Sequence, residues 1–264
     1  MQEIERIRRL RRGGFTLFTQ RERVCGFTLI ELLVVMGIIS LLMVLVVPAF
    51  TNIKSGTDVT SAAYKIKGVL DTARTYAKAN NTYTWVGFYE ENVSNPSSPN
   101  SNTPAIGRLV MSMVASKDGT NIYGSSSGPI DPTKLFQIDK LAKIDNVHLW
   151  THTDAPSGAG STYGLRPNVA STYCIGNSSP SNSATPFQYP VGSPAPSAQY
   201  NFVKAVQFSP GGEARINNNS NSLQTVAEVG LEPTHGAAAP VSIPANVVAV
   251  QFTGIAGDVR IYRR

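Results

Sequence analysis

The chain has 264 residues, of which 42% are hydrophobic and only 15% are charged. The charged fraction is well below the roughly 25% that is typical of soluble domains. The net charge of +6 is concentrated at one end, since residues 1–26 contain seven arginines and three glutamates. The remainder is close to neutral, which argues against a body that binds nucleic acid through its overall charge. With only two cysteines, Cys25 and Cys174, a disulfide-rich scaffold is excluded.

An almost continuous apolar run follows at residues 27–50, with the sequence FTLIELLVVMGIISLLMVLVVPAF. As a helix, Phe27–Val47 would be roughly 31 Å long, about the thickness of a bilayer core. The arginines before it predict that its N-terminal side stays in the cytoplasm. The run is too long for the apolar part of a cleaved secretory signal, and Val46–Phe50 is a poor match to the A-x-A pattern of such a cleavage site. We therefore expect a retained membrane-spanning helix at residues 27–47.

One acidic residue, Glu31, interrupts the beginning of this run. A carboxylate inside a bilayer costs about 2.5–3.5 kcal/mol on insertion scales, so its presence needs a reason. Either Glu31 lies close enough to the membrane surface to stay hydrated, or it has a specific partner.

The residues around Glu31 read VCGFTLIE at positions 24–31. They resemble the prepilin signature of type IV pilins and type II secretion pseudopilins, in which a glycine precedes Phe-Thr-Leu-Ile-Glu and an apolar helix. The resemblance implies that a prepilin peptidase cleaves after Gly26 and that Phe27 becomes an N-methylated N-terminus. The α-ammonium of Phe27 would then pair with Glu31 of a neighbouring subunit and set the register between subunits. Pro48 stands where the family also carries a proline, and we expect it to kink the helix.

The same resemblance implies a structural role, as a minor pseudopilin or pilin-like subunit of a type II secretion or type IV pilus-like filament. The implied partners are a prepilin peptidase, other pilin or pseudopilin subunits, an inner-membrane assembly platform with its ATPase, and membrane lipid. Residues 1–26 would be a cytoplasmic basic leader that is removed. The protein would cross the bacterial inner membrane once, with its head in the periplasm, and could be extracted into a filament. A plain membrane-anchored surface protein that shares only the helix is the alternative.

Helical periodicity resumes after a polar stretch at residues 52–58 and predicts a pilin-like α+β fold. One long helix over residues 27–80 would pack on a small antiparallel sheet in a head of residues 81–264. Asp71 and Arg74 are spaced for a surface ion pair. The segment LDTARTYAKANN at residues 70–81 also resembles GspH/FimT-type minor pseudopilins, and the long leader with Ser/Asn-rich insertions more weakly resembles the D component of the Verru_Chthon cassette. The apolar stripe comprises Val59, Ala62, Ala63, Ile66, Val69, Leu70, Ala73, Tyr76 and Ala77.

Alternating apolar residues predict the strands of the head. Residues 92–104 and 154–200 are rich in Ser, Asn, Pro and Gly, and we expect them to be exposed loops because they can bury little apolar area. The predicted strands are Thr82–Tyr89, Ile106–Ala115, one or two strands within residues 135–150, and two hairpins made of Phe202–Phe208 with Glu213–Ile216 and of Val247–Phe252 with Asp258–Tyr262.

No pattern in the sequence indicates an enzyme, and we expect no catalytic residue, metal or cofactor. His148 and His152 have the spacing of helical metal ligands, but their context is that of a strand, where they would lie roughly 13 Å apart. Asp131 and Asp258 adjoin turn residues and are expected to cap backbone groups. Cys174 is expected to be a small buried residue, with no disulfide partner once Cys25 is removed.

The C-terminus, RIYRR at residues 260–264, is a short basic cluster. Such a cluster is usually a solvated strand end. The alternative is contact with DNA, as implied by the resemblance to FimT-like pilins that act in DNA uptake. In that case Arg260, Arg263 and Arg264 would contact phosphates, Arg215 would extend the basic surface, and Tyr262 would stack on a base.

Overall fold

The structure is a computed structural model that describes residues 28–95, 105–121, 129–152, 163–177, 185–216, 222–240 and 244–264. Helix α1 spans Leu29–Ala79 and includes Pro48. The chain divides into two compact units between Pro48 and Ala49. The kink that we expect at Pro48 therefore stays a prediction, whereas the long helix of the predicted α+β fold is present.

The described strands all lie in the second unit. Ten of them form one sheet in the order β12-β11-β10-β4-β2-β1-β8-β9, with β3 paired to β2 and β5 to β10, while β6 and β7 form a separate hairpin. The pairing is antiparallel except between β5 and β10. The sheet is therefore larger than the small antiparallel sheet predicted. The strands are β1 (Thr84–Asn92), β2 (Gly107–Ser116), β3 (Leu135–Gln137), β4 (Ala142–Leu149), β5 (Cys174–Ile175), β6 (Phe187–Tyr189), β7 (Tyr200–Phe202), β8 (Lys204–Phe208), β9 (Ala214–Ile216), β10 (Val226–Pro233), β11 (Val248–Thr253) and β12 (Val259–Arg263).

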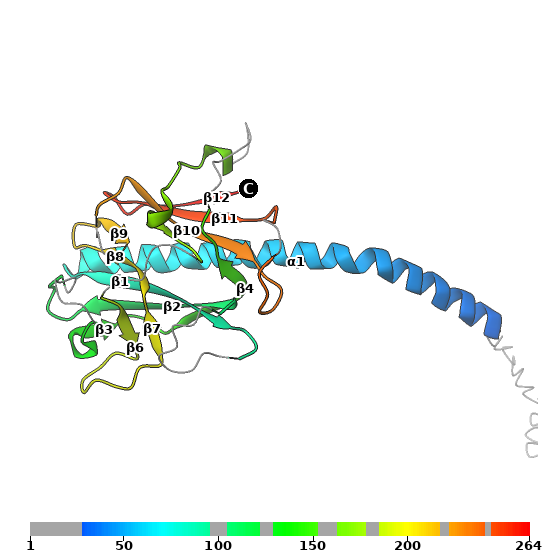
Figure 1. The fold of residues 1–264 in the computed structure, drawn as a ribbon, viewed down its shortest axis with the longest axis horizontal. Helices are drawn as coiled ribbons and strands as arrows, with labels where there is room; N and C mark the ends of the chain where they lie inside the picture. Colours follow the sequence, from blue (N-terminus) through cyan, green and yellow to red (C-terminus); the bar gives the residue numbers. More distant parts are fainter. Residues whose placement is uncertain are drawn as a thin grey trace, which may run out of the picture. The chain divides into compact units, whose positions relative to one another are not determined.

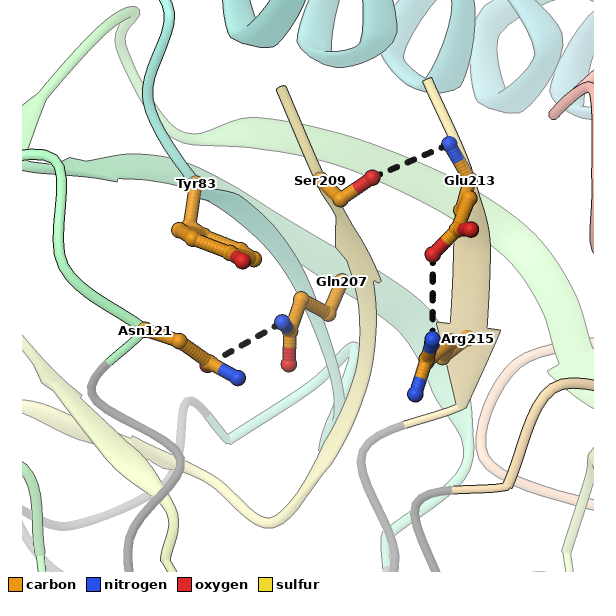
Figure 2. Close-up of a pocket in the computed structure, with 6 residues that line it drawn as sticks. All are labelled: Tyr83, Asn121, Gln207, Ser209, Glu213 and Arg215. Carbon is orange, nitrogen blue, oxygen red and sulfur yellow. Dashed lines mark hydrogen bonds and ion pairs between the residues drawn. The ribbon is translucent and has the colours of Figure 1, made fainter. Parts of the chain in front are cut away.

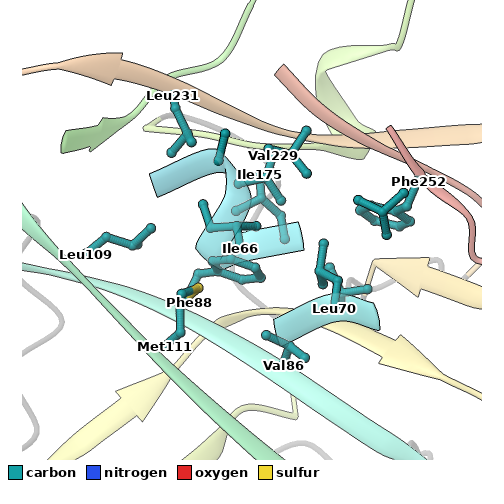
Figure 3. Packing of buried hydrophobic residues seen from close by; sticks show 14 of the residues in the cluster. Ile66, Leu70, Val86, Phe88, Leu109, Met111, Ile175, Val229, Leu231 and Phe252 are labelled. Carbon is teal, nitrogen blue, oxygen red and sulfur yellow. The ribbon is translucent and has the colours of Figure 1, made fainter. Parts of the chain in front are cut away.

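The sheet curves around the C-terminal half of α1 and buries its apolar stripe. Strands β10, β11 and β12 lie on one side of the helix, and β1 and β2 lie on the other (Figure 1). Ile66 and Leu70 of the helix pack among side chains from both parts of the sheet, including Phe88 and Phe252 (Figure 3). The predicted stripe is confirmed, since its members are buried except for the half-buried Val69 and Tyr76.

The two edges of the sheet meet near the end of the helix. The backbone N–H of Ala214, in edge strand β9, donates to Gly254 O in the turn between β11 and β12 at 2.7 Å. Arg74 of α1 pairs with Asp258 at 3.2 Å, next to the same turn. The predicted Asp71–Arg74 pair is therefore wrong, and Asp71 pairs instead with Lys67 at 3.0 Å. Asp131, in contrast, caps a short 3-10 helix as predicted, accepting a hydrogen bond from Thr133 N at 2.9 Å.

A second apolar layer covers the face of the sheet that points away from α1. Its centre is the β6–β7 hairpin, in which the rings of Phe187 and Phe202 stack with their centroids 4.9 Å apart. Gly87 of β1 permits this approach, because a Cβ at that position would lie 2.5 Å from Phe202 Cγ. The layer also contains Trp85, Tyr89, Val110, Val114, Ile130, Leu135, Tyr200 and Ala205.

Most predicted strands are confirmed, with shifted ends. Residues 135–150 contain the two strands β3 and β4, and the β8–β9 and β11–β12 hairpins are both formed. The strand predicted at Phe202–Phe208 is broken between β7 and β8, because Phe202 belongs to the hairpin that covers the outer face.

The prediction of an exposed loop at residues 154–200 is wrong for the parts that the structure describes. This segment contains β5, β6 and the beginning of β7. It also contributes buried side chains, those of Tyr163, Arg166, Cys174, Ile175 and Phe187. Of these, Arg166, Cys174 and Ile175 lie against β10, a strand that is not among those predicted from the sequence. Tyr163 packs on Val247 and Ala249 instead, and Phe187 belongs to the outer apolar layer.

A buried carboxylate joins the four strands β1, β2, β4 and β7. Glu91 of β1 has no exposed surface and pairs with Arg108 of β2 at 3.2 Å and with Lys143 of β4 at 2.9 Å. The Tyr200 hydroxyl also donates to Glu91, at 3.0 Å. Burial raises the pKa of Glu91, but the hydrogen bonds from Lys143, Arg108 and Tyr200 outweigh this effect and hold the pKa below its ordinary value.

Candidate functional site

The N-terminus of α1 is closed by a reciprocal pair of side-chain contacts. Glu31 N donates to Thr28 Oγ1 at 3.3 Å, and Glu31 Oε2 accepts from Thr28 N and from Thr28 Oγ1, both at 3.4 Å. This is a capping box, in which residues three apart satisfy backbone N–H groups at the beginning of a helix. The T-x-x-E spacing of residues 28–31 is the sequence signal from which this cap could have been predicted. In the single chain, Glu31 therefore has an intramolecular partner.

The helix that follows presents apolar side chains on all sides. Exposed fractions range from 45% at Val35 and Ile39 to 83% at Leu29. Exposed apolar surface that encircles a helix requires a bilayer or other protein around it. Glu31 is the acidic residue in this described apolar segment, and it is exposed.

Within the described part of the chain, no helix is both long and apolar enough to cross a membrane. Gly26 and Phe27, the predicted cleavage site and methylated residue, lie outside the described residues. The same holds for the side chains of residues 45–57, among them that of Pro48.

The N-terminal segment also has a counterpart among known proteins. Residues 21–47 match the family model described as the prokaryotic N-terminal methylation motif. This match supports a type IV pilin-like subunit of a pilus or secretion filament. The motif implies processing by a prepilin peptidase and assembly with other pilin subunits, and it is typical of membrane-anchored structural proteins and not of enzymes. No curated protein and no solved structure matches the chain.

The residues predicted to contact DNA lie on two strands, β12 and β9. Arg260, Arg263 and Arg264 are exposed on or beside edge strand β12, and Arg263 lies over the ring of Tyr64 with its guanidinium 5.7 Å from the ring centroid. Tyr262 is half-buried and packs against Tyr163, Val247 and Ala249. Arg215 lies on β9, the edge strand that meets the turn between β11 and β12, and pairs with Glu213 at 3.0 Å.

The two histidines with metal-ligand spacing have separate partners. His148 Nδ1 lies 2.7 Å from Glu90 Oε1, and His152 Nε2 lies 3.3 Å from Val248 O. His152 follows the end of β4, so the prediction that both lie on one strand is wrong. Among the residues described, no group of three or more His, Cys, Asp or Glu side chains is arranged to hold a metal ion.

His148 belongs to a buried cluster of titratable groups from four strands. Glu90 of β1 accepts from Leu149 N at 2.8 Å in addition to its contact with His148. Glu232 of β10 is paired with His148 across the strands and is 2% exposed, and its Oε1 has no hydrogen-bond partner. Lys204 of β8 donates through Nζ to Gly176 O and to Asn177 O.

Burial is the main cause of the two pKa shifts in this cluster, those of Glu232 and Lys204. Burial raises the pKa of Glu232 from 4.5 to about 7, while His148 lowers it and the carboxylate of Glu90 raises it further. Burial likewise lowers the pKa of Lys204, against the attraction of Glu90. Charging Glu232 therefore opposes the folded state. Local sequence patterns could not indicate this cluster, because its members are far apart along the chain.

We expect the head to lose stability as the pH rises from about 4.5 to about 7. Because the pKa of Glu232 is raised on folding, its stabilising effect is complete below 4.5 and is lost as the pH rises through 7. The loss is up to about 3 kcal/mol at 1.4 kcal/mol per pKa unit. Urea unfolding of the full chain in detergent at pH 5 and pH 8, followed by tryptophan fluorescence, would measure it. Glu232→Gln should flatten this pH dependence, whereas Asp258→Asn should not, and an unchanged slope in Glu232→Gln would contradict the assignment.

Proposed function

We propose that the chain is a minor pseudopilin or pilin-like structural subunit of a type II secretion or type IV pilus-like filament. Processing after Gly26 would remove the leader of residues 1–26 and leave Phe27 as an N-methylated N-terminus. The methylation-motif match at residues 21–47 is the observation that carries this proposal. It is supported by the exposed apolar surface of α1, which requires an apolar environment.

In this proposal, residues 27–47 cross the bacterial inner membrane once, with the leader in the cytoplasm and residues 81–264 forming the periplasmic head. On assembly, Glu31 leaves its contact with Thr28 and pairs with the α-ammonium of Phe27 in a neighbouring subunit. An inner-membrane platform with its ATPase would drive extraction of the subunit from lipid into the filament. Within the family, the β8–β9 and β11–β12 hairpins favour a GspH/FimT-type subunit, since these two hairpins resemble the closing sheet of that type.

Processing can be tested by co-expressing the chain with and without a prepilin peptidase. We expect intact mass and N-terminal sequencing to give a peptidase-dependent start at Phe27, with or without one added methyl group. Gly26→Leu should keep the full-length chain, because a bulky side chain prevents the backbone from entering the peptidase site. A full-length chain in the presence of an active peptidase would contradict the proposal and favour the plain membrane anchor.

Contact with DNA is a second proposal, supported by the exposed arginines at the end of β12. It predicts that the full chain in detergent shifts a DNA duplex at low salt and that the shift weakens steeply as salt is added. Replacing Arg260, Arg263 and Arg264 together by alanine should abolish the shift. Because Arg215 is paired with Glu213 on another strand, Arg215→Ala is the matched control and should have a smaller effect. Absence of a shift at low salt would exclude this role.

A further inference from the structure

A small polar pocket opens on the face of the sheet that points away from α1. Its volume is about 70 Å³, and Tyr83, Asn121, Gln207, Ser209, Glu213 and Arg215 line it (Figure 2). One water needs about 10–15 Å³ of such space, so the pocket accommodates a group of a few heavy atoms. The pocket is distinct from the N-terminal motif and from the arginines of β12.

Gln207 supplies an unsatisfied polar atom in this pocket. Its side chain is 3% exposed, and its Nε2 donates to Asn121 Oδ1 at 3.2 Å. Its Oε1 is buried and has no hydrogen-bond partner. The amide lies between Asn121 and the Glu213–Arg215 pair, with Oε1 directed into the space that these side chains border (Figure 2). A buried acceptor without a partner costs about 1–3 kcal/mol, which a ligand donor would recover. The hydrogen bond from Gln207 Nε2 to Asn121 Oδ1 fixes this orientation, since the rotated amide would place two acceptor oxygens against each other.

The remaining walls favour a neutral group that both donates and accepts hydrogen bonds. Glu213 and Arg215 pair at 3.0 Å and cancel each other's charge. Ser209 Oγ accepts from Glu213 N at 3.2 Å, which holds the turn between β8 and β9 in place. Beside them, the ring of Tyr83 stacks on that of Trp85, with centroids 6.5 Å apart. An aromatic ring next to amide and charged groups is a suitable surface for the apolar face of a sugar.

We infer that this pocket binds the acetamido group of an N-acetylated amino sugar. The acetamido N–H donates to Gln207 Oε1, its carbonyl accepts from the Arg215 guanidinium, and the sugar ring stays outside the pocket against Tyr83. A pendant acetamido group enters a space of this size, whereas a peptide bond within a chain is flanked by two Cα substituents and does not. A primary carboxamide, as in a glutamine side chain, is the other source of the same chemistry, but it lacks the ring that would cover Tyr83.

The inference can be tested by saturation-transfer NMR on the full chain, kept in a detergent without a sugar headgroup. N-acetylglucosamine is the probe, glucose is the matched sugar without the acetamido group, and free glutamine tests the carboxamide source. We expect saturable transfer to the acetyl methyl signal of N-acetylglucosamine and none to glucose. Gln207→Leu should weaken the binding about tenfold, the effect of one hydrogen bond lost in a buried site.

Gln188→Leu is the control variant, since Gln188 is a half-buried glutamine on the separate β6–β7 hairpin. It should bind N-acetylglucosamine like the unchanged chain. Thermal unfolding would establish that both variants are folded before binding is compared. Equal transfer to glucose, transfer only to glutamine, unchanged binding by a folded Gln207→Leu variant, or a pocket that holds ordered water only would each overturn the inference.

Discussion

Replacing Glu31 by alanine is expected to lower the amount of chain recovered in filaments by roughly tenfold or more, with membrane insertion unchanged. The reason is that the α-ammonium of the processed Phe27 would be left without its partner in an apolar environment. The measurement is the fraction of chain in sheared filaments relative to the membrane fraction, in a host that supplies the peptidase and the assembly machinery. Normal filament formation by Glu31→Ala would contradict the pairing.

The capping box offers a second explanation for the same residue, and two further variants separate the explanations. Glutamine also functions at the N3 position of a capping box, so Glu31→Gln keeps the cap and removes the charge. Thr28→Ala removes the hydroxyl of the cap and keeps the charge, at a cost of about 1 kcal/mol in helix stability. If charge pairing governs assembly, Glu31→Gln should fail like Glu31→Ala, and Thr28→Ala should assemble. If instead Glu31→Gln assembles and Thr28→Ala fails, Glu31 acts in assembly only by capping the helix.

Replacing Gly230 by alanine is expected to destabilise the head by about 3 kcal/mol, the upper range for overpacking a core. A Cβ on Gly230 would overlap Trp150 O and would lie 2.8 Å from His152 Cδ2. The segment cannot move away without loss of the hydrogen bond from Trp150 N to Gly230 O, which is 2.9 Å long. The substitution therefore pushes the segment after β4 away from β10, which lies between β11 and β4 in the sheet.

Thermal unfolding followed by the fluorescence of Trp85 and Trp150 would measure this effect. A loss of 3 kcal/mol corresponds to a fall in Tm of roughly 6–12 °C for a chain of this size. Gly68→Ala is the matched control, because a Cβ at Gly68 of α1 would meet nothing within 4 Å. It should leave Tm unchanged or raise it, since alanine favours a helix by up to about 1 kcal/mol over glycine. Equal effects of the two substitutions would contradict the packing argument.

Local patterns were enough to predict the elements that depend on neighbours in sequence. The apolar stripe from Val59 to Ala77 repeats with helical periodicity, and the turns at Pro210–Gly212 and Gly254–Gly257 separate alternating segments, so the helix and both hairpins could be predicted. Strand β10 also alternates apolar residues with Glu228, Gly230 and Glu232, yet its outward acidic residues are typical of a solvent-facing strand. They are buried because residues 150–152 and 163–175 cover them, which no local pattern indicates.

The candidate functional residues also include some that neighbouring positions in the sequence predict and others that they do not. The GFTLIE segment at residues 26–31 lies in one short stretch, so the methylation motif could be recognised from the sequence. Cleavage after Gly26 and the pairing of Glu31 between subunits stay predictions. The capping contact of Glu31 with Thr28 is also local, and it could have been predicted from the T-x-x-E spacing. The pocket around Gln207 could not, because Tyr83, Asn121 and Arg215 come from segments that only the sheet brings together.

The residues alone were sufficient to predict the methylation motif, the apolar first half of the helix and the stripe by which its second half packs. These properties depend on side chains within a few turns of one another, so local periodicity is sufficient to read them. The three-dimensional structure was needed to establish that β10 lies inside the sheet, where the sheet edges meet, and which polar groups lose contact with water. Glu91, Gln207 and Glu232 are buried because distant segments pair over them. Burial raises the pKa of Glu232, whereas hydrogen bonds from Lys143, Arg108 and Tyr200 hold the pKa of Glu91 below its ordinary value.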